Sequence, residues 1–497
     1  MQPELRNGEA IPWRAIPELS LTEFRSALLQ RCRTGARIAV WFAVPATEPG
    51  YLTMLAVLAD DSASVLYPMA APYRAGTPFP SLTPELPQAS MFERELWEEH
   101  AVQIEGHPWL KPVRRHAHAA RHDGPALPSF PFYRVDGTGV HEVGVGPVHA
   151  GIIEPGHFRF QCHGEKVLFL EIRLGYQHRG LERALLSASE AKQTILAESI
   201  AGDTVLGHAI AYAMVREAIA ATSVPYAADV TRGMALELER LANHVGDLGA
   251  LANDVAFLPA AAYLGRLRGD VLNLLLELSG NRFGRSLVVP GGVRTSFAPE
   301  KRTRWIHQLA TIEADLEQIC QLLWETPSVL SRFEHTGVVP TAVARDLGFV
   351  GPTARASGVA RDVRRDHPAG AYCFAHVPLT LVSSGDVFAR ALVRWTESMR
   401  SLQFLQEQLA DFEPTQLGRA LGPSQPNVVA VAMVEGWRGE IVHVGVTGSH
   451  GELSAYKIVD PSFRNWTALA VAVRDGEISD FPLCNKSFNL SYAGHDL

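Results

Sequence analysis

The apolar residues of the segment 231–255 have a spacing that places them on one face of a long helix. Such a helix is stable when this apolar face is buried against the rest of the protein. The apolar residues are Met234, Leu238, Leu241, Val245, Leu248, Ala252 and Val255, separated by alternating steps of four and three. A second stripe beside them is ionisable and consists of Glu237, Arg240, His244, Asp247 and Asp254. The spacing alone favours a solvated face for this second stripe, although a buried charged site would have the same spacing.

The rest of the chain of 497 residues divides into two regions of different pattern. Near the N-terminus the pattern predicts a helix over residues 21–31, with Ser20 as its N-cap, and strands over 36–44 and 51–58. Beyond residue 140 it predicts strands over 158–175 around a turn at Gly164 and Glu165, and strands again within 427–473. The further predicted helices cover residues 181–216, 263–278, 301–326 and 386–409. We therefore expect an α+β protein, in which a small α/β domain precedes a larger, mainly helical domain with β segments at both ends.

The cysteines are few and widely separated. They are Cys32, Cys162, Cys320, Cys373 and Cys484, and no two lie closer than 53 residues. This spacing excludes a zinc ribbon and the ligand runs of iron–sulfur proteins, and an odd, dispersed set argues against a secreted disulfide framework. We expect buried, reduced cysteines and a chain that holds no iron–sulfur cluster of its own.

The charge balance is mildly acidic, with 45 Lys and Arg against 53 Asp and Glu and a formal net charge of −8. A nucleic-acid-binding protein would normally present a basic face, so we expect no nucleic acid as a partner. The apolar run at 428–434 has the length of a strand, and the N-terminus lacks the pattern of a signal peptide. The sequence therefore predicts a chain that reaches a membrane only through partner subunits.

A polar stretch rich in histidine and proline, RRHAHAARHDGPALPSFP, covers residues 114–131. Its composition is typical of a solvated linker. The alternative interpretation is a metal site with His116, His118 and His122 as ligands. No cluster of carboxylates or cysteines accompanies these histidines to support it.

Two motifs near residue 100 resemble the signature of the 30-kDa subunit of respiratory complex I. They read ERELWE at 93–98 and EGHPWL at 105–110. Later motifs resemble the 49-kDa subunit of complex I and its relatives, the large subunits of nickel–iron hydrogenases. These later motifs are GPVH at 146–149, GYQHRGLE at 175–182, ELER at 237–240 and PGGV at 290–293.

The order of these motifs resembles the fused large subunit of hydrogenase-4 and formate-hydrogenlyase-type membrane complexes. The resemblance implies a 30-kDa-like domain over 1–120, a linker over 121–140 and a 49-kDa-like domain over 141–497. It also implies a hetero-oligomer with a small subunit that carries a 4Fe–4S cluster, a ferredoxin-like subunit and antiporter-like membrane subunits. Such a chain would lie on the cytoplasmic side of the cell membrane, held there by its partners.

In the nickel–iron hydrogenases two CxxC motifs supply four thiolates, which are the soft ligands that the metals need. The resemblance places the first pair at Ala201 and Thr204 and the second pair at Ser462 and Asn465, so all four ligands are missing. We therefore expect no nickel–iron centre and no other metal site in this chain.

In complex I the same cavity binds a quinone head group, which needs hydrogen-bond donors at its carbonyls and a source of protons. The resemblance assigns one donor to His149, while the tyrosine donor of complex I falls close to Gly202 and is absent here. Asp254 matches the helix carboxylate that partners the loop histidine. The resemblance also implies that the ionisable stripe, which includes His244, is buried and lines this cavity. The alternative is that these residues form a buried network with a structural role and take no part in electron transfer.

Two further assignments follow from the resemblance. Glu154 lies in a segment similar to the EGH motif of hydrogenases, whose glutamate relays protons, and a loop salt bridge is the alternative. His178 and Arg179 resemble the pair that faces the terminal 4Fe–4S cluster of the small subunit, and a packing role is the alternative. With no ligands present, we expect the C-terminal tail to be retained.

These observations predict a peripheral-arm subunit of a complex I-like or hydrogenase-4-like membrane oxidoreductase. It would pass electrons from the cluster of a partner to a quinone-like acceptor, between the 146–157 loop and the segments 198–208 and 244–254. Any nicotinamide would be oxidised in another subunit. The alternatives are a non-redox scaffold that couples partners to ion or proton movement, and a working hydrogenase with unusual ligands.

Overall fold

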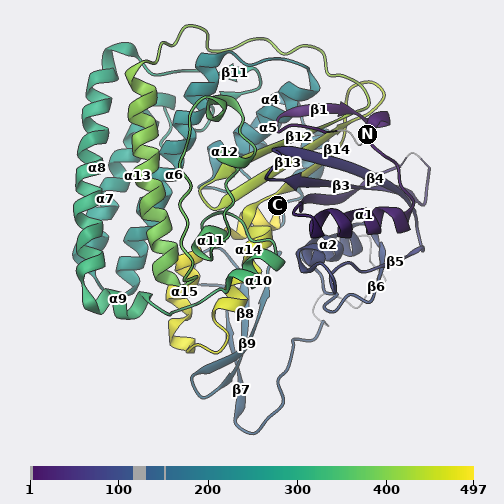
Figure 1. The fold of residues 1–497 in the computed structure, drawn as a ribbon, viewed down its shortest axis with the longest axis horizontal. Helices are drawn as coiled ribbons and strands as arrows, with labels where there is room; N and C mark the ends of the chain where they lie inside the picture. Colours follow the sequence, from purple (N-terminus) through teal and green to yellow (C-terminus); the bar gives the residue numbers. More distant parts are fainter. Residues whose placement is uncertain (1–3, 47, 116–129, 150, 152) are drawn as a thin grey trace.

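The computed structural model describes residues 4–46, 48–115, 130–149, 151 and 153–497. Figure 1 shows a helical bundle on one side, a small β-rich unit on the other side and a sheet between them. Helices and strands are mixed along the whole chain, which confirms the predicted α+β class. Residues 121–129 of the linker predicted at 121–140, and the three histidines His116, His118 and His122, lie outside the described residues.

The N-terminal unit is built on an antiparallel sheet of three strands covered by two helices. Its elements are α1 (Leu21–Arg33), β2 (Arg37–Pro45), β3 (Tyr51–Asp60), β4 (Val65–Arg74), β5 (Pro78–Pro80), α2 (Ser90–His100) and β6 (Gln103–Glu105). Ser20 accepts a hydrogen bond from the amide of Glu23, and the Glu23 side chain accepts one from the amide of Ser20, so the predicted N-cap is confirmed as a capping box. The predicted helix and both strands are confirmed within two residues of each end.

The central sheet joins the two ends of the chain. Strand β1 (Glu9–Pro12) pairs with β12 (Val428–Gly436), which continues to β13 (Gly439–Thr447) and β14 (Leu453–Val459), all antiparallel. Apolar side chains of β12 to β14 also pack into the same core as β2 and β3. The N-terminal unit is therefore fused to the end of the chain by a shared hydrophobic core, and its predicted boundary at residue 120 remains a prediction.

The third sheet is a protruding antiparallel unit of β7 (Val140–Val145), β8 (His157–His163) and β9 (Lys166–Arg173). Strands β8 and β9 flank the turn at Gly164 and Glu165, as the alternation of residues predicted. The loop between β7 and β8 carries His149 and Glu154, and Figure 1 places the far end of the unit away from the bundle.

The predicted helix over 181–216 is wrong as a single element. The structure has α3 (Leu181–Ser187), α4 (Glu190–Glu198) and α5 (Val205–Ile219) in its place. Ser189 begins α4, and the turn that contains Gly202 separates α4 from α5. Residues of this type favour helix ends and turns over helix interiors, which explains both breaks.

The helical bundle is centred on α6 (Tyr226–Asp254), which packs against α7 (Leu258–Ser279) and α13 (Val387–Ala410), with α8 (Arg302–Glu325) behind them. The predicted helices of this region are confirmed, and Asp386 caps α13 by accepting a hydrogen bond from the amide of Ala389. Short elements connect them: β10 (Val288–Val289), β11 (Gly292–Val293), α9 (Pro327–Phe333), α10 (Thr341–Asp346), α11 (Gly351–Ala356) and α12 (Val363–Asp366). Among the described helices, none is long and apolar enough to cross a bilayer.

The chain ends in three short helices, α14 (Pro461–Ala472), α15 (Phe481–Phe488) and α16 (Tyr492–Asp496). The PSFRNW segment, expected among strands, begins α14, because Asp460 caps it and Pro461 occupies its first turn. Figure 1 places the C-terminus in the middle of the molecule, and residues 491–497 are all buried.

Candidate functional site

The ionisable stripe of α6 is buried, so the solvated face that spacing favoured is wrong for most of it. Glu237, Arg240 and His244 have no exposed surface, and Asp247 is 3% exposed. Asp254, at the end of the helix, is exposed. The stripe is therefore the wall of a charged interior, and Asp254 lies outside that interior.

The partners of this stripe come from α13 and the central sheet. Glu397 lies 2.5 Å from Arg240 Nη2 and 2.7 Å from Arg355 Nε, and Arg355 Nη1 also lies 2.8 Å from Glu435. Burial would raise the pKa of Glu397, but Arg355 and Arg240 hold it well below its usual range. Removing one member of such a buried network costs about 3–5 kcal/mol, because the remaining charge loses its partner.

His244 lies at the centre of the network. Its Nε2 is 3.3 Å from Glu397 Oε2, and its ring meets the ring of Trp437 edge-on at 6.3 Å. Burial lowers the pKa of His244 to about 4, against the opposing effect of Glu397 and with the help of Arg240. The imidazole is therefore neutral near pH 7.

The four positions that the family resemblance matches to the thiolate ligands of nickel–iron hydrogenases are all buried here. They are Ala201, Thr204, Ser462 and Asn465. The Thr204 hydroxyl accepts hydrogen bonds from Trp437 Nε1 at 3.1 Å and from Arg438 Nη1 at 3.2 Å. The Ser462 hydroxyl accepts from the amide of Ser491.

Asn465 completes the set by bonding both main-chain groups of Val350, at 3.1 Å and 3.0 Å. Alanine offers no donor atom, and the other three side chains bond the chain itself. Among the described residues no group of three His, Cys, Asp or Glu is arranged to hold a metal ion. The donor set therefore does not fit a nickel–iron centre, which needs soft thiolates.

An ion-pair cluster joins the two former ligand segments. Arg438 forms a bidentate pair with Asp203, at 2.6 Å and 2.7 Å, and its Nε donates to the main-chain oxygen of Asn489. Asp460 accepts from the amide of Ser462 at 2.7 Å. Burial raises the pKa of Asp460, but the hydrogen bond from His208 and the charge of Arg438 lower it below its usual value. The cluster fixes the start of α5 against the start of α14.

A chain of buried side chains leads from this cluster across the central sheet. His208 Nε2 lies 3.1 Å from Asp460 Oδ2, and His208 Nδ1 lies 3.0 Å from His443 Nε2. His443 Nδ1 lies 2.8 Å from the Tyr456 hydroxyl. Burial, with the nearby His208, holds the pKa of His443 well below its usual value, so His443 is neutral.

The C-terminal segment occupies the space between the predicted acceptor loop and the predicted cluster-facing turn. Asp496 accepts hydrogen bonds from the amides of Gly175 and Gln177, at 2.7 Å and 2.9 Å. His178 Nδ1 lies 2.7 Å from the main-chain oxygen of Asp496. The Arg179 guanidinium donates to three main-chain oxygens, those of Ser199, Ile200 and Ala493.

The loop between β7 and β8 closes on the same segment. Glu154 Oε2 accepts from the amides of Tyr492 and Ala493, at 3.2 Å and 3.3 Å, so this carboxylate caps α16. His149 Nε2 lies 2.9 Å from the main-chain oxygen of Gly156, and its ring centre lies 6.5 Å from that of Tyr492. The structure thus brings His149, Glu154 and the turn at 178–179 together around one short helix.

Two predicted residues do not join this group directly. Asp254, which the resemblance pairs with the loop histidine, lies at the exposed end of α6, where the charge of Lys486 in α15 acts on its carboxylate. His244 belongs to the network around Glu397, on the other side of Trp437 from Thr204. Gly202, at the place of the missing tyrosine, is exposed, and a side chain added there would meet open space.

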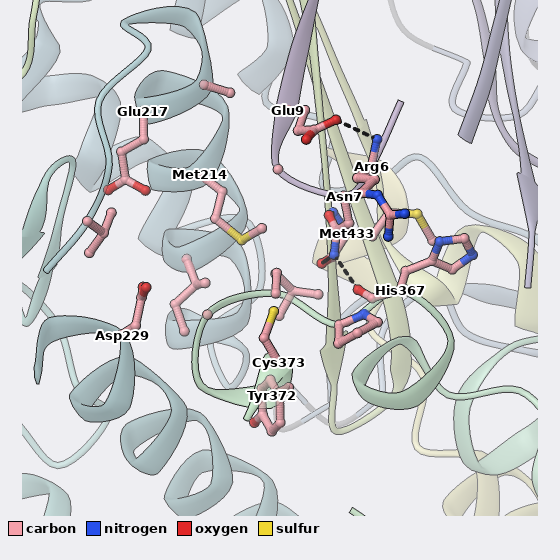
Figure 2. A pocket seen from close by; sticks show the side chains of 18 of the residues that line it. Arg6, Asn7, Glu9, Met214, Glu217, Asp229, His367, Tyr372, Cys373 and Met433 are labelled. Atoms are coloured by element: carbon pink, nitrogen blue, oxygen red, sulfur yellow. Dashed lines mark hydrogen bonds between the residues drawn. The ribbon is translucent and has the colours of Figure 1, made fainter. Parts of the chain in front are cut away.

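A cavity of about 830 Å³ lies beside β1, the C-terminal half of α5 and the N-terminal half of α6, and of the charged network described above it contacts Glu435. Figure 2 shows Glu217 and Asp229 on one side of it, Arg6 and Glu9 on the other, and Cys373 in the wall. Burial raises the pKa of Asp229 to about 6, against the opposing charge of Arg232. None of the predicted site residues lines this cavity.

Sequence reasoning missed the residues that fill the site. Arg438 and Trp437 occupy a turn between two strands and carry no motif, and the C-terminal segment was expected only to be retained. The signal that could have found Asp496 is that it is the one acidic residue of the segment 481–497, because a carboxylate buried there needs hydrogen-bond donors.

Comparisons with known proteins identify the family of this chain. Residues 39–133 match the respiratory-chain NADH dehydrogenase 30-kDa subunit, and residues 254–420 match the 49-kDa subunit. Hydrogenase-4 component G of Escherichia coli is 30% identical over 437 residues, which cover 84% of this chain and 76% of that protein. The carbon monoxide-induced hydrogenase of Rhodospirillum rubrum is 32% identical over 352 residues, covering 70% of this chain and 97% of that protein.

NADH-quinone oxidoreductase subunit 4 of Thermus thermophilus is 28% identical over 371 residues, covering 69% of this chain and 90% of that protein. A solved chain of an archaeal membrane-bound sulfane sulfur reductase has the same fold, with a TM-score of 0.66, 24% identity and coverage of 73% of this chain and all of that one. The chain therefore belongs to the family of complex I-like and hydrogenase-4-type large subunits, with 30-kDa-like and 49-kDa-like regions fused in one polypeptide.

Proposed function

We propose that this chain passes electrons from a 4Fe–4S cluster in a small partner subunit to a quinone-like acceptor, and that it holds no nickel–iron centre. The observation that carries the proposal is the set of four buried positions, Ala201, Thr204, Ser462 and Asn465, none of which offers a thiolate. The three polar side chains, those of Thr204, Ser462 and Asn465, already form hydrogen bonds with other groups of the same chain. An electron acceptor other than a resident metal is then needed.

Exposed apolar side chains around the acceptor loop support a docking face for the small subunit. Val148 is 77% exposed, Ile153 is 47% exposed and Tyr176 is 49% exposed. They lie on the loop and on the turn that also carry His149 and His178. Clustered exposed apolar residues are typical of subunit interfaces, and a partner docked there would enclose the acceptor between the two chains.

Reduction of a quinone to a quinol takes two electrons and two protons, one at each carbonyl oxygen. His149 suits the donor role, because it is half-buried and its Nε2 is fixed by the oxygen of Gly156. When the ring is protonated, Nδ1 can donate to a quinone oxygen. Glu154, which caps α16, would hold the loop in place.

Membrane attachment through partners completes the proposal. The membrane-bound hydrogenase subunit alpha of Pyrococcus furiosus is 28% identical over 354 residues. We infer a place for this chain on the cytoplasmic side of the membrane, with a ferredoxin-like subunit and antiporter-like membrane subunits as further partners.

A non-redox scaffold is the second candidate, and one observation favours it. The C-terminal segment fills the space next to His149, and the Arg179 side chain is fully engaged with main-chain oxygens. In that case the charged interior would transmit structural changes between partners without electron transfer. A hydrogenase with unusual ligands is the third candidate, and the missing thiolates make it the weakest.

Quinol formation by the purified complex, reduced through its small subunit, separates the first two candidates. The proposal predicts measurable turnover in the wild type and a loss of at least about 10-fold in His149→Ala, since a positioned proton donor contributes 10²-fold or more. The matched control is His141→Ala, on the exposed side of β7. A complex of normal composition that reduces no quinone would favour the scaffold, and full activity in His149→Ala would remove His149 from the site.

A further inference from the structure

A second cavity lies between the N-terminal unit and the end of the chain, apart from the acceptor loop. Its volume is about 680 Å³, and its walls come from α2 with residues 109–115, from β9 and from α14. In Figure 1 these elements lie below the central sheet, where α2 and α14 approach each other. A cavity of this size is within the range of small-molecule sites.

The walls carry a strong excess of positive charge. The cationic side chains are Arg94, Lys111, Arg115, Arg173, Arg464 and Arg474, and the one carboxylate among the described lining residues is Glu171. Glu171 is already shared between Lys111 Nζ at 3.0 Å and Arg173 Nε at 2.9 Å. In a chain with a net charge of −8, such a group requires an explanation.

Carboxylates just behind the walls neutralise these cations only in part. Glu98 accepts from the amides of Val113, Arg114 and Arg115. Glu440 is paired with Arg37 at 2.5 Å and lies farther from Arg464, at 3.7 Å from its Nη2. Burial lowers the pKa of Arg115, and the neighbouring Arg173 adds to that effect. Five of the cations therefore lie in a buried or half-buried wall whose carboxylates compensate them only in part, and Arg474 is exposed.

One of them, Arg464, has a buried donor without a partner. The side chain lines the cavity and is 5% exposed, and its Nη1 and Nη2 donate to the main-chain oxygens of Ile38 and Ala39. Its Nε has no hydrogen-bond partner among the described residues. A buried, unbonded guanidinium N–H is costly, and an anion in the cavity would satisfy it.

Aromatic rings also line the cavity, beside the Lys111–Glu171 pair, and Lys111 Nζ lies 4.0 Å from the centre of the Trp109 ring. Tyr133 packs on Phe169 with ring centres 4.4 Å apart, and Trp109 lies 5.5 Å from Tyr133. Tyr133 is 42% exposed, so part of its ring surface is open to a ligand. Flat aromatic surfaces of this kind stack on planar heterocycles.

We infer that this cavity binds an anion of nucleotide size, with a phosphate or carboxylate group held by the cations of the cavity wall and a planar ring stacked on the exposed part of Tyr133. The site is independent of the acceptor loop and of any electron transfer. It joins the N-terminal unit to the C-terminal helices, so an occupant would brace these two parts against each other.

Equilibrium dialysis of the purified complex with radiolabelled ADP, adenosine and inorganic phosphate tests the inference. We expect ADP to bind more tightly than phosphate and adenosine, since it alone offers both the charge and the ring. Arg115→Gln and Arg474→Gln should each weaken ADP binding about 10-fold, because each removes one charge-assisted contact. Tyr133→Leu should weaken ADP binding and leave phosphate binding unchanged.

The matched control is Arg14→Gln, which changes an exposed arginine outside the cavity and should leave ADP binding unchanged. The inference is overturned if no ADP binds, if ADP binds no more tightly than phosphate, or if the cavity variants bind ADP like the wild type. Because the readout is binding, a negative result here does not bear on quinone reduction, and a complex without quinone activity can still show the site.

Discussion

The main-chain amide of Arg179 donates a 2.7 Å hydrogen bond to the main-chain oxygen of Leu497. The amide of Gly180 donates to the same oxygen at 3.0 Å. The turn at 178–180, which the family resemblance predicts to face the cluster of a partner subunit, is thus held by hydrogen bonds to Leu497. Its shape depends on residues more than 300 positions away in the sequence.

Replacing Asp496 by alanine should destabilise the chain by about 2–4 kcal/mol. The amides of Gly175 and Gln177 would both lose their acceptor, and a buried donor left without one costs about 1–3 kcal/mol. Denaturant unfolding of the purified chain measures this change. The control is Asp475→Ala, which removes an exposed pair with Lys166 and should cost less than about 1 kcal/mol. Equal effects of the two substitutions would show that the turn does not depend on Asp496.

Acidification should destabilise the chain through His244. Its pKa is lowered to about 4 in the folded state, while an unfolded histidine titrates near 6.5. The unfolded state therefore binds the proton first, and stability is lost as the pH falls from about 6.5 to about 4, by roughly 3 kcal/mol in total. His244→Gln should show a shallower loss of stability between pH 7 and pH 5 than the wild type. The exposed His450→Gln serves as the control. A wild-type slope in His244→Gln would contradict a neutral, buried His244.

The docking face should depend on its exposed apolar residues. Val148→Asp and Tyr176→Asp each place a charge where a partner subunit would exclude water, so the iron–sulfur small subunit should be lost on affinity purification. Leu322→Asp, at a 45% exposed position on α8, is the control and should retain that subunit. Retention of the small subunit in both docking variants, at wild-type stoichiometry, would place the interface elsewhere.

Gly202 offers a gain-of-function test. Its position is exposed and free of steric contact, so Gly202→Tyr should fold normally and return a hydroxyl donor beside the former ligand segment. If the acceptor binds there, the KM for a short-chain quinone should fall about 5-fold or more, as one added hydrogen bond of about 1 kcal/mol would give. Gly202→Ala, which adds no donor, is the comparison. Identical KM values in the two variants would separate the acceptor from this segment.

The sequence alone predicted the long helices well and the burial of their charged stripe poorly. The apolar spacing around Leu238 and Leu248 locates α6, because that pattern is local. Whether Arg240 lies in water or in the core depends on Glu397, which is 157 residues away and carries no signal in the local pattern. Only the family resemblance indicated a buried site there.

In the candidate site, too, local motifs were found from the sequence and long-range contacts were not. The motifs singled out His149, His178 and Arg179 without relating them in space, and the structure brings them around α16. The role of α16 could not be predicted, because it rests on main-chain groups that any sequence would offer. The break between α3 and α4 could have been predicted from Ser189, and the break between α4 and α5 from Gly202, because residues of both types favour helix ends.

The central claim is that a large subunit of this family works here without a nickel–iron centre. Elemental analysis of the purified complex, with nickel and iron counted per copy of this chain, tests it most directly. We predict less than about 0.1 nickel per chain, together with iron at the stoichiometry of the partner clusters, because thiolates alone would hold the metal. One nickel per chain, retained after dialysis against a chelator, would contradict the account.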